Sequence, residues 1–314
     1  MIDKMYREQL QKISFEDIKG WAHDNHLDAF NTLKRGNPLS LSDLKIFNRN
    51  SARKYFEENY QPYKILNKFN EETLYTGYFE PILHASTSKT EIYNKPLYGF
   101  PKKNVKKFLE LTRKEIEEDV LWDLPILAWI SNTIDLYFMH IQGSGTLKFE
   151  NGIERRFVFD GKNNYEYTSV GRYLTDNKFI NKNQISMQSI KKWMNSHPEN
   201  IAIKYINKSF IFFKEDVINE SNRSSPLGQL GVRLTALRSL AVDMSIYSIN
   251  TPIWINTIIP IKGLGKFERF ERLMLAQDKG SAIKGLFRGD IFFGNDEKAG
   301  YMKSRGDIII FNKL

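Results

Sequence analysis

The final third of the chain, from Pro226 to Leu314, constrains the fold more than any other part. Ten of the protein's 19 glycines fall there, between short apolar runs at Ser239–Asp243, Ile253–Ile259, Glu271–Gln277, Asp290–Phe293 and Asp307–Phe311. Apolar runs of this length, bounded by glycine turns, predict short strands. Dense glycine between such strands favours a small, tightly wound barrel over an open sheet.

The first sixty residues have a helical pattern instead. Ser14 can cap a helix with Asp17 three residues on, and an apolar stripe continues from there as far as Leu33. Further helices are expected near Leu41 and from Ala52 to Tyr60. Helices in front and strands behind argue against alternating βαβ units.

The middle of the chain mixes both patterns. The run TLYTGYFEPIL, from about Leu74, is β-branched and aromatic, and it predicts a strand. Helices are expected at Lys103–Glu118 and Ser186–Asn195, and short strands at Ile134–Ile141, Glu154–Phe159 and Ser209–Lys214.

Composition limits the classes of protein. With 314 residues and 41% hydrophobic residues, the chain is long enough for two domains with real cores. The absence of cysteine excludes disulfides, thiolate zinc sites, a cysteine nucleophile and a lipid-anchored cysteine. The charged N-terminal eighteen residues have no apolar core of a signal peptide, and no apolar run is long enough to cross a membrane, so a soluble protein is expected.

The formal net charge of +9 favours a polyanionic partner such as nucleic acid, an acidic lipid surface or an acidic polymer. The densest basic cluster is Lys102, Lys103, Lys106 and Lys107, which is typical of a solvated helix start rather than of a phosphate-tracking stripe. Nucleic-acid binding is therefore the least favoured function, and no nucleic-acid partner is expected.

Three acids in the glycine-rich region could carry chemistry. Asp290 lies in RGDIFFG beside apolar rings, where desolvation would raise its pKa and make it usable as a general acid. Asp278 and Asp243 both follow apolar strands. Each of the three could equally cap its own turn, and local sequence leaves that alternative open.

Other candidate motifs are weaker. The GSG run at 143–145 lacks the spacing of a phosphate loop, so its glycines are expected to turn Gln142 and Ser144 toward a ligand. His23 and His26 are expected to be solvated on a helix, and His140 to lie in or beside a core strand. No metal-ligand set or serine-hydrolase elbow is found in the sequence.

The chain resembles the membrane-bound lytic transglycosylase A family, known as MltA, from about residue 20 to 312. The matching segments, in family order, are WAHDNHLDAF, ARKYFEENYQPY, TGYFEP, YFMHIQGSG, DGKN, SVGRYL, PLGQLGVRLTALRSLAVD, RLMLAQDKGSAIKG, RGDIFFG and AGYMKSRG. Each segment alone is a weak signal, whereas all of them together are highly specific.

The resemblance implies a mainly β fold with N-terminal helices, in which a double-psi β-barrel domain is interrupted by a second β-rich domain. Residues 1–95 and 216–314 would build the barrel with its helices, and residues 96–215 would form the inserted domain. The glycan would lie in a groove between the two domains.

The resemblance also implies the site. Asp290 matches the family's catalytic acid and Asp278 a supporting acid, while Thr76, Tyr78, Gln142, Ser144, Lys284 and Lys303 match positions expected to bind substrate. The implied reaction is non-hydrolytic cleavage of peptidoglycan to 1,6-anhydro ends, with one aspartate acting first as acid and then as base. No metal or organic cofactor is expected.

The expected partners are peptidoglycan glycan strands and proteins of cell-wall synthesis or the divisome, and the expected state is a monomer. The family implies a periplasmic or outer-membrane location, although this sequence has neither a signal peptide nor a lipobox cysteine.

The sequence departs from the family pattern in three loops. Lys279 and Ser281 give QDKGSAIKG where QDTGGAIKG is usual, Ala236-Leu237 replaces a glycine-containing dipeptide, and SIYSIN at 245–250 replaces a turn containing proline and glycine. Two rival functions stay open at this point: a hydrolytic glycosidase that pairs Asp290 with Asp278 or Asp243, and a cell-wall-binding protein without activity.

Overall fold

The computed structural model describes residues 9–66, 72–119, 124–220, 223, 225–261 and 265–314, so part of the charged N-terminal segment lies outside it. The chain divides into two compact units. The first holds residues 1–78, 227–294 and 302–314, and the second holds residues 79–226 and 295–301. The boundaries expected at residues 95 and 216 differ from this division, because β4 (Ile82–Ser86) pairs with strands of the second unit.

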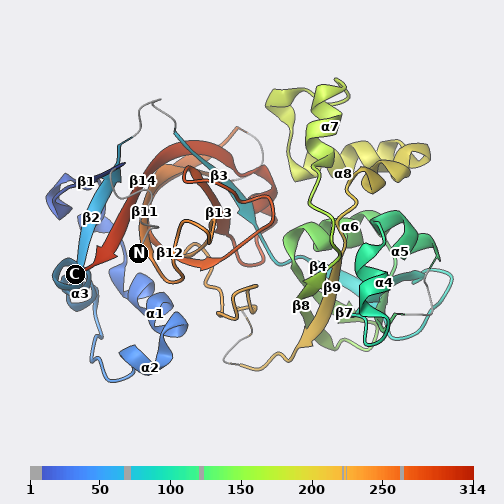
Figure 1. Cartoon of the computed structure of the whole chain (residues 1–314), viewed down its shortest axis with the longest axis horizontal. Coiled ribbons are helices and arrows are strands. Elements are labelled where there is room, and N and C mark those ends of the chain that lie inside the picture. The colour runs from blue at the N-terminus through green and yellow to red at the C-terminus, as the bar shows by residue number, and fades with distance from the viewer. Residues whose placement is uncertain (1–8, 67–71, 120–123, 221–222, 224, 262–264) are drawn as a thin grey trace. The chain divides into compact units, whose positions relative to one another are not determined.

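Six strands of the first unit close into a barrel (Figure 1). In order around it they are β3 (Thr73–Tyr78), β13 (Arg288–Phe292), β10 (Ser239–Ala241), β12 (Phe267–Asp278), β11 (Pro252–Pro260) and β14 (Lys303–Lys313). Antiparallel pairing of β14 with β3 completes the ring. A barrel domain interrupted by a second β-rich domain is therefore confirmed.

Five of these strands are the short runs that the glycine spacing predicts, and the sixth, β3, is the predicted strand at Leu74. Two more strands, β1 (Leu10–Lys12) and β2 (Tyr60–Ile65), extend the sheet outward from β14. Gly306, within β14, shows why glycine is needed where β14 approaches β11: a Cβ there would lie 2.1 Å from the carbonyl oxygen of Asn256 on β11. At that position only glycine lets the two strands approach.

The N-terminal region is helical, but the single helix expected from Ser14 is wrong. The capping box of Ser14 and Asp17 is present, yet it caps only the 3-10 turn η2 (Phe15–Asp17), because Gly20 adopts φ 81 and breaks the helix. A second 3-10 turn, η3 (Trp21–His23), precedes α1 (His26–Gly36), and α2 (Pro38–Leu41) and α3 (Arg49–Asn59) follow.

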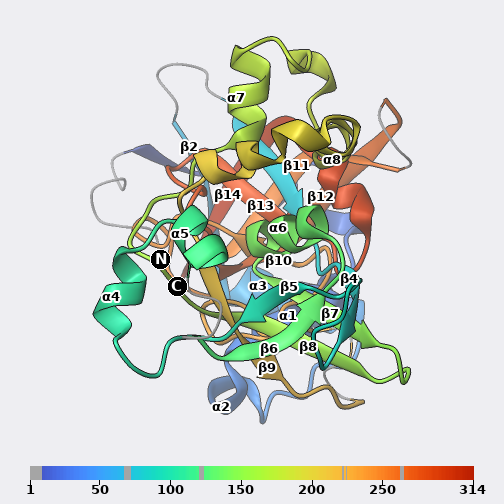
Figure 2. The same ribbon diagram turned by 90° about the vertical axis from the view of Figure 1, so that its right-hand side faces the viewer.

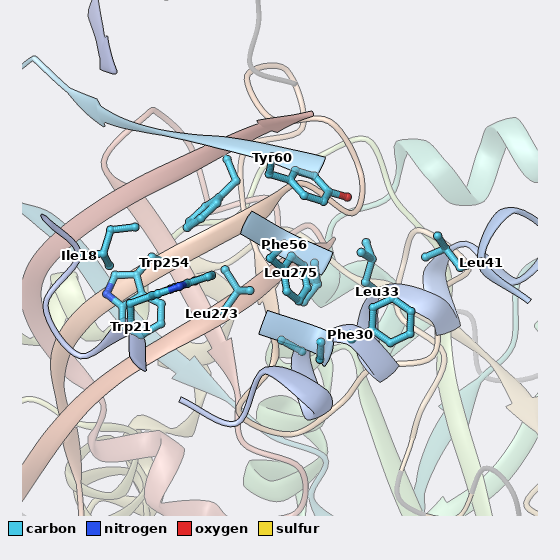
Figure 3. Close-up of a cluster of buried hydrophobic side chains, with 13 residues drawn as sticks. Ile18, Trp21, Phe30, Leu33, Leu41, Phe56, Tyr60, Trp254, Leu273 and Leu275 are labelled. Carbon is cyan, nitrogen blue, oxygen red and sulfur yellow. The ribbon is translucent and has the colours of Figure 1, made fainter. Parts of the chain in front are cut away.

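The helices cover the barrel through a shared apolar core (Figure 3). Trp21 stacks on Phe311 of β14 at 5.4 Å between ring centroids and contacts Trp254 of β11 edge-on at the same distance. Phe30 of α1 and Phe56 of α3 complete the layer, and both are no more than 1% exposed. Burial on this scale, about 25 cal/mol per Å² of apolar surface, ties the N-terminal helices to the C-terminal strands.

A buried ion pair reinforces the same junction. Arg238 donates to both carboxylate oxygens of Asp24 at 2.7 and 2.8 Å, and the side chains are 3% and 2% exposed. Asp24 also accepts from the backbone N–H of Leu273. His26 is buried beside this pair at 1% exposure, so its expected solvation is wrong; its ring meets the edge of Trp21 at 4.3 Å.

The second unit contains a six-stranded sheet in the order β5 (Lys95–Tyr98), β6 (Ile126–Ile130), β4, β7 (Ser144–Phe149), β8 (Glu154–Lys162) and β9 (Ile211–Asp216). Its helices are α4 (Val105–Glu110), α5 (Arg113–Asp119), α6 (Thr133–Gln142), α7 (Val170–Asp176) and α8 (Met187–Ser196), with 3-10 turns η4 (Lys182–Gln184), η5 (Pro198–Ile206) and η6 (Glu297–Tyr301). Figures 1 and 2 show α7 and α8 at one end of this unit, the sheet at the other, and α6 between them.

The strand expected at Ile134–Ile141 is wrong, because this segment forms helix α6. Asn132 caps it by accepting from two backbone N–H groups, and Gly143 ends it in the left-handed region at φ 85. His140 therefore lies on a helix and not on a strand, although it is buried as expected, with its ring against Phe210. In the described residues, no helix is long and apolar enough to cross a membrane.

Candidate active site

The strand register of the barrel aligns the predicted site residues. Thr76 of β3 lies opposite Lys303 of β14 on one side and opposite Asp290 of β13 on the other. Asp290 in turn lies opposite Ala241 of β10, and Ala241 opposite Asp278 of β12. Directly paired residues project from the same face of a sheet, so this row brings together acids and bases from distant parts of the chain.

Asp290 is held by a short hydrogen bond. The hydroxyl of Thr76 donates to Asp290 Oδ1 at 2.5 Å, and Arg288 donates through Nη2 to the same hydroxyl oxygen at 2.7 Å. Arg288 is itself fixed, since its Nη1 donates to the carbonyl oxygens of Gly289 and Leu74. Asp290 is half-buried.

Burial raises the pKa of Asp290 above its ordinary value, although the positive charge of Arg288 and the hydrogen bond from Thr76 oppose this shift. Desolvation disfavours the carboxylate, whereas a nearby cation and a hydrogen-bond donor favour it. The net upward shift makes a protonated Asp290 more abundant near neutral pH than an ordinary aspartic acid would be.

Asp278 lies at the end of β12 and is almost fully enclosed. Its Oδ1 accepts from the backbone N–H groups of Gln229 and Lys279, and its Oδ2 accepts from the Tyr78 hydroxyl, each at 2.9 Å. Burial is the largest influence and raises the pKa of Asp278 to about 6, against the effect of these three donors and with a further increase from the charge of Asp290. Asp278 is 6% exposed, and its carboxylate accepts hydrogen bonds from groups of the protein itself.

Asp243 has a structural role. Its Oδ2 accepts from the N–H of Gly285, and its Oδ1 accepts from the N–H and hydroxyl of Ser245. Burial alone would raise the pKa of Asp243, but these hydrogen bonds and the charge of Lys284 outweigh it and lower the pKa. The two lysines predicted for the site lie in different parts of the barrel unit. Lys284 is exposed near Asp243, and Lys303 is exposed on β14 opposite Thr76.

Gln142 and Ser144 belong to the second unit. Gln142 ends helix α6, and its Oε1 accepts from the N–H of Phe79 at 2.9 Å. Ser144 begins β7, opposite Val158 of β8. Gly143 between them closes the helix, so the GSG run is a helix-to-strand turn within this unit.

Two of the family departures fall on strained backbone. Leu237 has φ 55 and Asn250 has φ 61, both in the left-handed region that glycine adopts without strain. Asn tolerates this region better than Leu, and Asn250 also bonds Gly36 and Gln277 through its side chain. Lys279 and Ser281 are exposed beside Asp278 and change the loop surface.

Arg288 is the residue that sequence reasoning missed. It precedes Asp290 by two positions, and i, i+2 residues of a strand share one face, so an arginine at this spacing is the signal that the sequence offers. Its bond to Thr76, 212 positions away, is visible only in the fold. Among the described residues, no group of three or more histidines and acids is arranged to hold a metal ion.

Two family models match the chain. The MltA specific insert domain matches residues 74–214, and the 3D domain matches residues 238–312. Membrane-bound lytic murein transglycosylase A of Escherichia coli (strain K12) is 33% identical over 233 residues, which are 72% of this chain and 61% of that protein. The homolog from Buchnera aphidicola subsp. Schizaphis graminum (strain Sg) is 36% identical over 234 residues, with the same coverage. The match thus spans about three fifths of the length of these curated relatives.

Solved structures share both units. The membrane-bound lytic murein transglycosylase from Agrobacterium tumefaciens superposes with a TM-score of 0.84 at 27% identity, covering 97% of this chain and 98% of that one. MltA from Neisseria gonorrhoeae gives 0.79 at 26% identity, covering 97% and 92%. E. coli MltA with bound chitohexaose gives 0.78 at 24% identity, covering 100% and 98%, and bears on the fold alone. The two family models in chain order, the relatives and the shared architecture agree: this chain belongs to the MltA family of membrane-bound lytic murein transglycosylases.

Proposed function

We propose that this protein is a lytic transglycosylase that cleaves peptidoglycan, with Asp290 as its catalytic residue. The curated relatives carry this activity in their names, and the barrel presents a half-buried aspartate with a raised pKa at the position where the sequence resemblance predicts the catalytic acid. The observation that carries the proposal is the Asp290 site itself: a carboxyl group of a half-buried residue that accepts from the Thr76 hydroxyl and whose neutral form is favoured by burial.

The proposed reaction breaks the β-1,4 bond between N-acetylmuramic acid and N-acetylglucosamine. Protonated Asp290 gives its proton to the glycosidic oxygen while the bond to C1 of the muramic sugar breaks. The Asp290 carboxylate then removes the proton from the C6 hydroxyl of that sugar, whose oxygen bonds C1 and closes the 1,6-anhydro ring. This second transfer leaves Asp290 protonated again, so one residue serves as acid and then as base.

One carboxylate suffices for this route because the nucleophile belongs to the substrate. The C6 hydroxyl is held close to C1 at a high effective concentration, so no water has to be activated. A hydrolytic glycosidase would need a second carboxylate free to act on water or on C1. Neither remaining acid fits that role, since Asp278 is enclosed by three donors and Asp243 holds its own turn.

The proposed substrate contacts extend from the same row. Thr76 and Tyr78 of β3, with Lys284 and Lys303, would contact glycan on the barrel side, and the exposed lysines would attract the peptide carboxylates of peptidoglycan. Gln142 and Ser144 of the second unit are also proposed to bind glycan. A periplasmic or outer-membrane location and partners in cell-wall synthesis remain predictions from the family.

The test is digestion of purified peptidoglycan with the protein and with Asp290→Asn. The wild type is expected to release muropeptides with 1,6-anhydro ends, which are one water lighter than hydrolytic products by mass spectrometry. The variant should lose about 10³-fold or more of the rate while it still binds glycan, because Asn cannot donate and recover a proton.

A matched control is Asp43→Asn, which changes an exposed aspartate of the helical region. This control should cleave at the wild-type rate. Recovery of reducing muropeptides alone from the wild type would contradict the mechanism, and full activity of Asp290→Asn would refute the site.

A further inference from the structure

We propose that Arg288 is a positioning residue that acts through the Thr76 hydroxyl, so that the transferable proton of Asp290 is carried by Oδ2. The catalytic consequence rests on the proposed function, whereas the arrangement of the three groups stands on its own. Arg288 itself need not touch substrate, because its effect reaches Asp290 through Thr76.

The geometry comes from two adjacent parallel strands. Arg288 and Asp290 are two residues apart on β13, so their side chains share one face. On β3, Thr76 lies directly opposite Asp290 and two residues beyond Leu74, which lies opposite Arg288. The hydroxyl is therefore within reach of both β13 side chains, at 2.7 Å from Arg288 Nη2 and 2.5 Å from Asp290 Oδ1.

The direction of the hydrogen bonds follows from the chemistry of the groups. A guanidinium has only donors, so Arg288 must donate to the Thr76 oxygen. A hydroxyl has one proton, and with its oxygen already accepting from Arg288, that proton goes to the nearest acceptor, Asp290 Oδ1. Thr76 is thus fixed as a donor to Oδ1 by the arginine on its other side.

A fixed donor makes the two carboxyl oxygens of Asp290 unequal. An oxygen that already accepts a short hydrogen bond is the poorer place for the acid proton, because that proton would face the proton of Thr76. Within the described residues, Oδ1 is the only oxygen of Asp290 with a hydrogen bond, so Oδ2 is available to a ligand. The proton of the acid form is therefore held on the side from which it can be given away.

The same contacts stabilise the carboxylate that remains after the proton has left. The charge of Arg288 and the Thr76 bond both lower the pKa of Asp290, while burial raises it more strongly. Without them, Asp290 would be a weaker acid and would give up its proton less readily. Two carbonyl oxygens, those of Leu74 and Gly289, hold the guanidinium in place, so its direction is set by the strands.

The first test needs no substrate. The pKa of Asp290 is measured by NMR titration of the ¹³C-labelled carboxyl group in the intact protein, and assigned by its loss in Asp290→Asn. Thr76→Val and Arg288→Met are each expected to raise this pKa by about one unit, since each removes a contact that favours the carboxylate. Thr76→Ser, which keeps the hydroxyl, should restore the wild-type value.

The control for a general disturbance of the barrel is Arg305→Met. Arg305 is an exposed arginine of β14 that lies opposite Leu74 and donates to the carbonyl oxygen of Glu72. It should leave the pKa of Asp290 unchanged. An unchanged pKa in Thr76→Val or Arg288→Met, or an equal shift in Arg305→Met, would overturn the proposal.

The second test separates position from charge. Arg288→Lys keeps the positive charge but lacks the two separate nitrogens through which the guanidinium bonds the carbonyl groups on one side and the Thr76 hydroxyl on the other. On the cleavage assay it should lower kcat with little change in KM, and the alkaline limb of its pH profile should move to higher pH. A wild-type kcat and pH profile in Arg288→Lys would mean that charge alone acts, which contradicts a positioning role. If the pKa of Asp290 changes in these variants as expected but the protein cleaves no peptidoglycan, the positioning role of Arg288 stands and the proposed function fails.

Discussion

Two aspartate–arginine pairs in the barrel unit have opposite properties. Arg238 contacts Asp24 directly through two hydrogen bonds with both side chains buried, and burial, which alone would raise the pKa of Asp24, is outweighed so that the pKa is lowered. Arg288 reaches Asp290 through the Thr76 hydroxyl, and burial keeps the pKa of Asp290 raised. The same two residue types favour the charged form of one carboxyl group and the protonated form of the other.

The difference lies in how the arginine is used. A direct fork matches the planar carboxylate with two charge-assisted hydrogen bonds, which suits a joint between helix and barrel. An arginine placed one hydroxyl away offsets only part of the desolvation penalty. The indirect arrangement therefore belongs at a site where protonation must remain possible, and the direct one where it must not.

Breaking the direct pair should have the largest effect on stability. Arg238→Met leaves the carboxylate of Asp24 buried without its partner, so we expect a loss of about 3–5 kcal/mol in the free energy of unfolding, measured by urea denaturation. The equivalent change at the indirect pair, Arg288→Met, should cost less, because Asp290 can become protonated instead.

A second variant tests whether the lost charge partner causes this effect. Asp24→Asn combined with Arg238→Met should lose clearly less than the sum of the two single changes, since no buried charge is left. Strict additivity would contradict the interpretation.

The next largest effect is the pH dependence of stability that Asp278 should cause. Asp278 has a pKa raised to about 6 by burial, so the folded protein binds its proton more tightly than the unfolded chain does. This residue therefore stabilises the fold least above pH 6, and stability should fall by roughly 3 kcal/mol between about pH 4 and 6 on its account. Asp278→Asn should remove this part of the slope in urea unfolding measured across that range.

Asp24 supplies the opposite case. Its lowered pKa contributes stability that is present above the unfolded pKa and lost as the pH falls through the lowered value. Asp24→Asn should therefore flatten the acid end of the curve and leave the region from pH 4 to 6 unchanged. If both variants altered the same pH range, the contrast between the two acids would be wrong.

The smallest effect on stability is expected at Leu237, next to the Asp24–Arg238 pair. Leu237 precedes Arg238 with φ 55, and Leu237→Gly would relieve that strain while losing some burial and making the unfolded chain more flexible. These contributions oppose each other, so the free energy of unfolding should change by less than about 1 kcal/mol, measured by the same urea assay. Leu237→Val, which is β-branched, should be the less stable of the two. A loss comparable to that of Arg238→Met would show that the Leu237 side chain anchors the loop.

The barrel could be predicted from sequence because its signals are local. Each predicted apolar run overlaps a strand of the barrel, and β11 (Pro252–Pro260) extends its run by only one residue at each end, whereas β12 and β14 continue over 12 and 11 residues. Helix α6 could not be predicted in the same way. Its apolar and aromatic residues favour a strand, whereas the Asn132 cap and the Gly143 end favour the helix that forms.

The site could be predicted only in part. The sequence indicates Asp290 and Asp278, but the roles of the three acids depend on donors that come from elsewhere in the chain, such as Gln229 for Asp278 and Gly285 for Asp243. His26 shows the same limit, since its sequence context predicts solvation, yet its ring is buried against Trp21. Burial and partners decide a residue's chemistry, and both are properties of the tertiary structure.

Closure of the barrel has a consequence for how the protein acquires its site. Strand β3 comes before the whole second unit in the chain, and its neighbours β13 and β14 come after it. Until β13 has been synthesised, β3 has no partner in the ring, while the inserted unit already has its complete sheet. Such long-range pairing is slow to form. Folding should therefore proceed from the middle of the chain outward, and acid chemistry at Asp290 becomes available only after the ends have met.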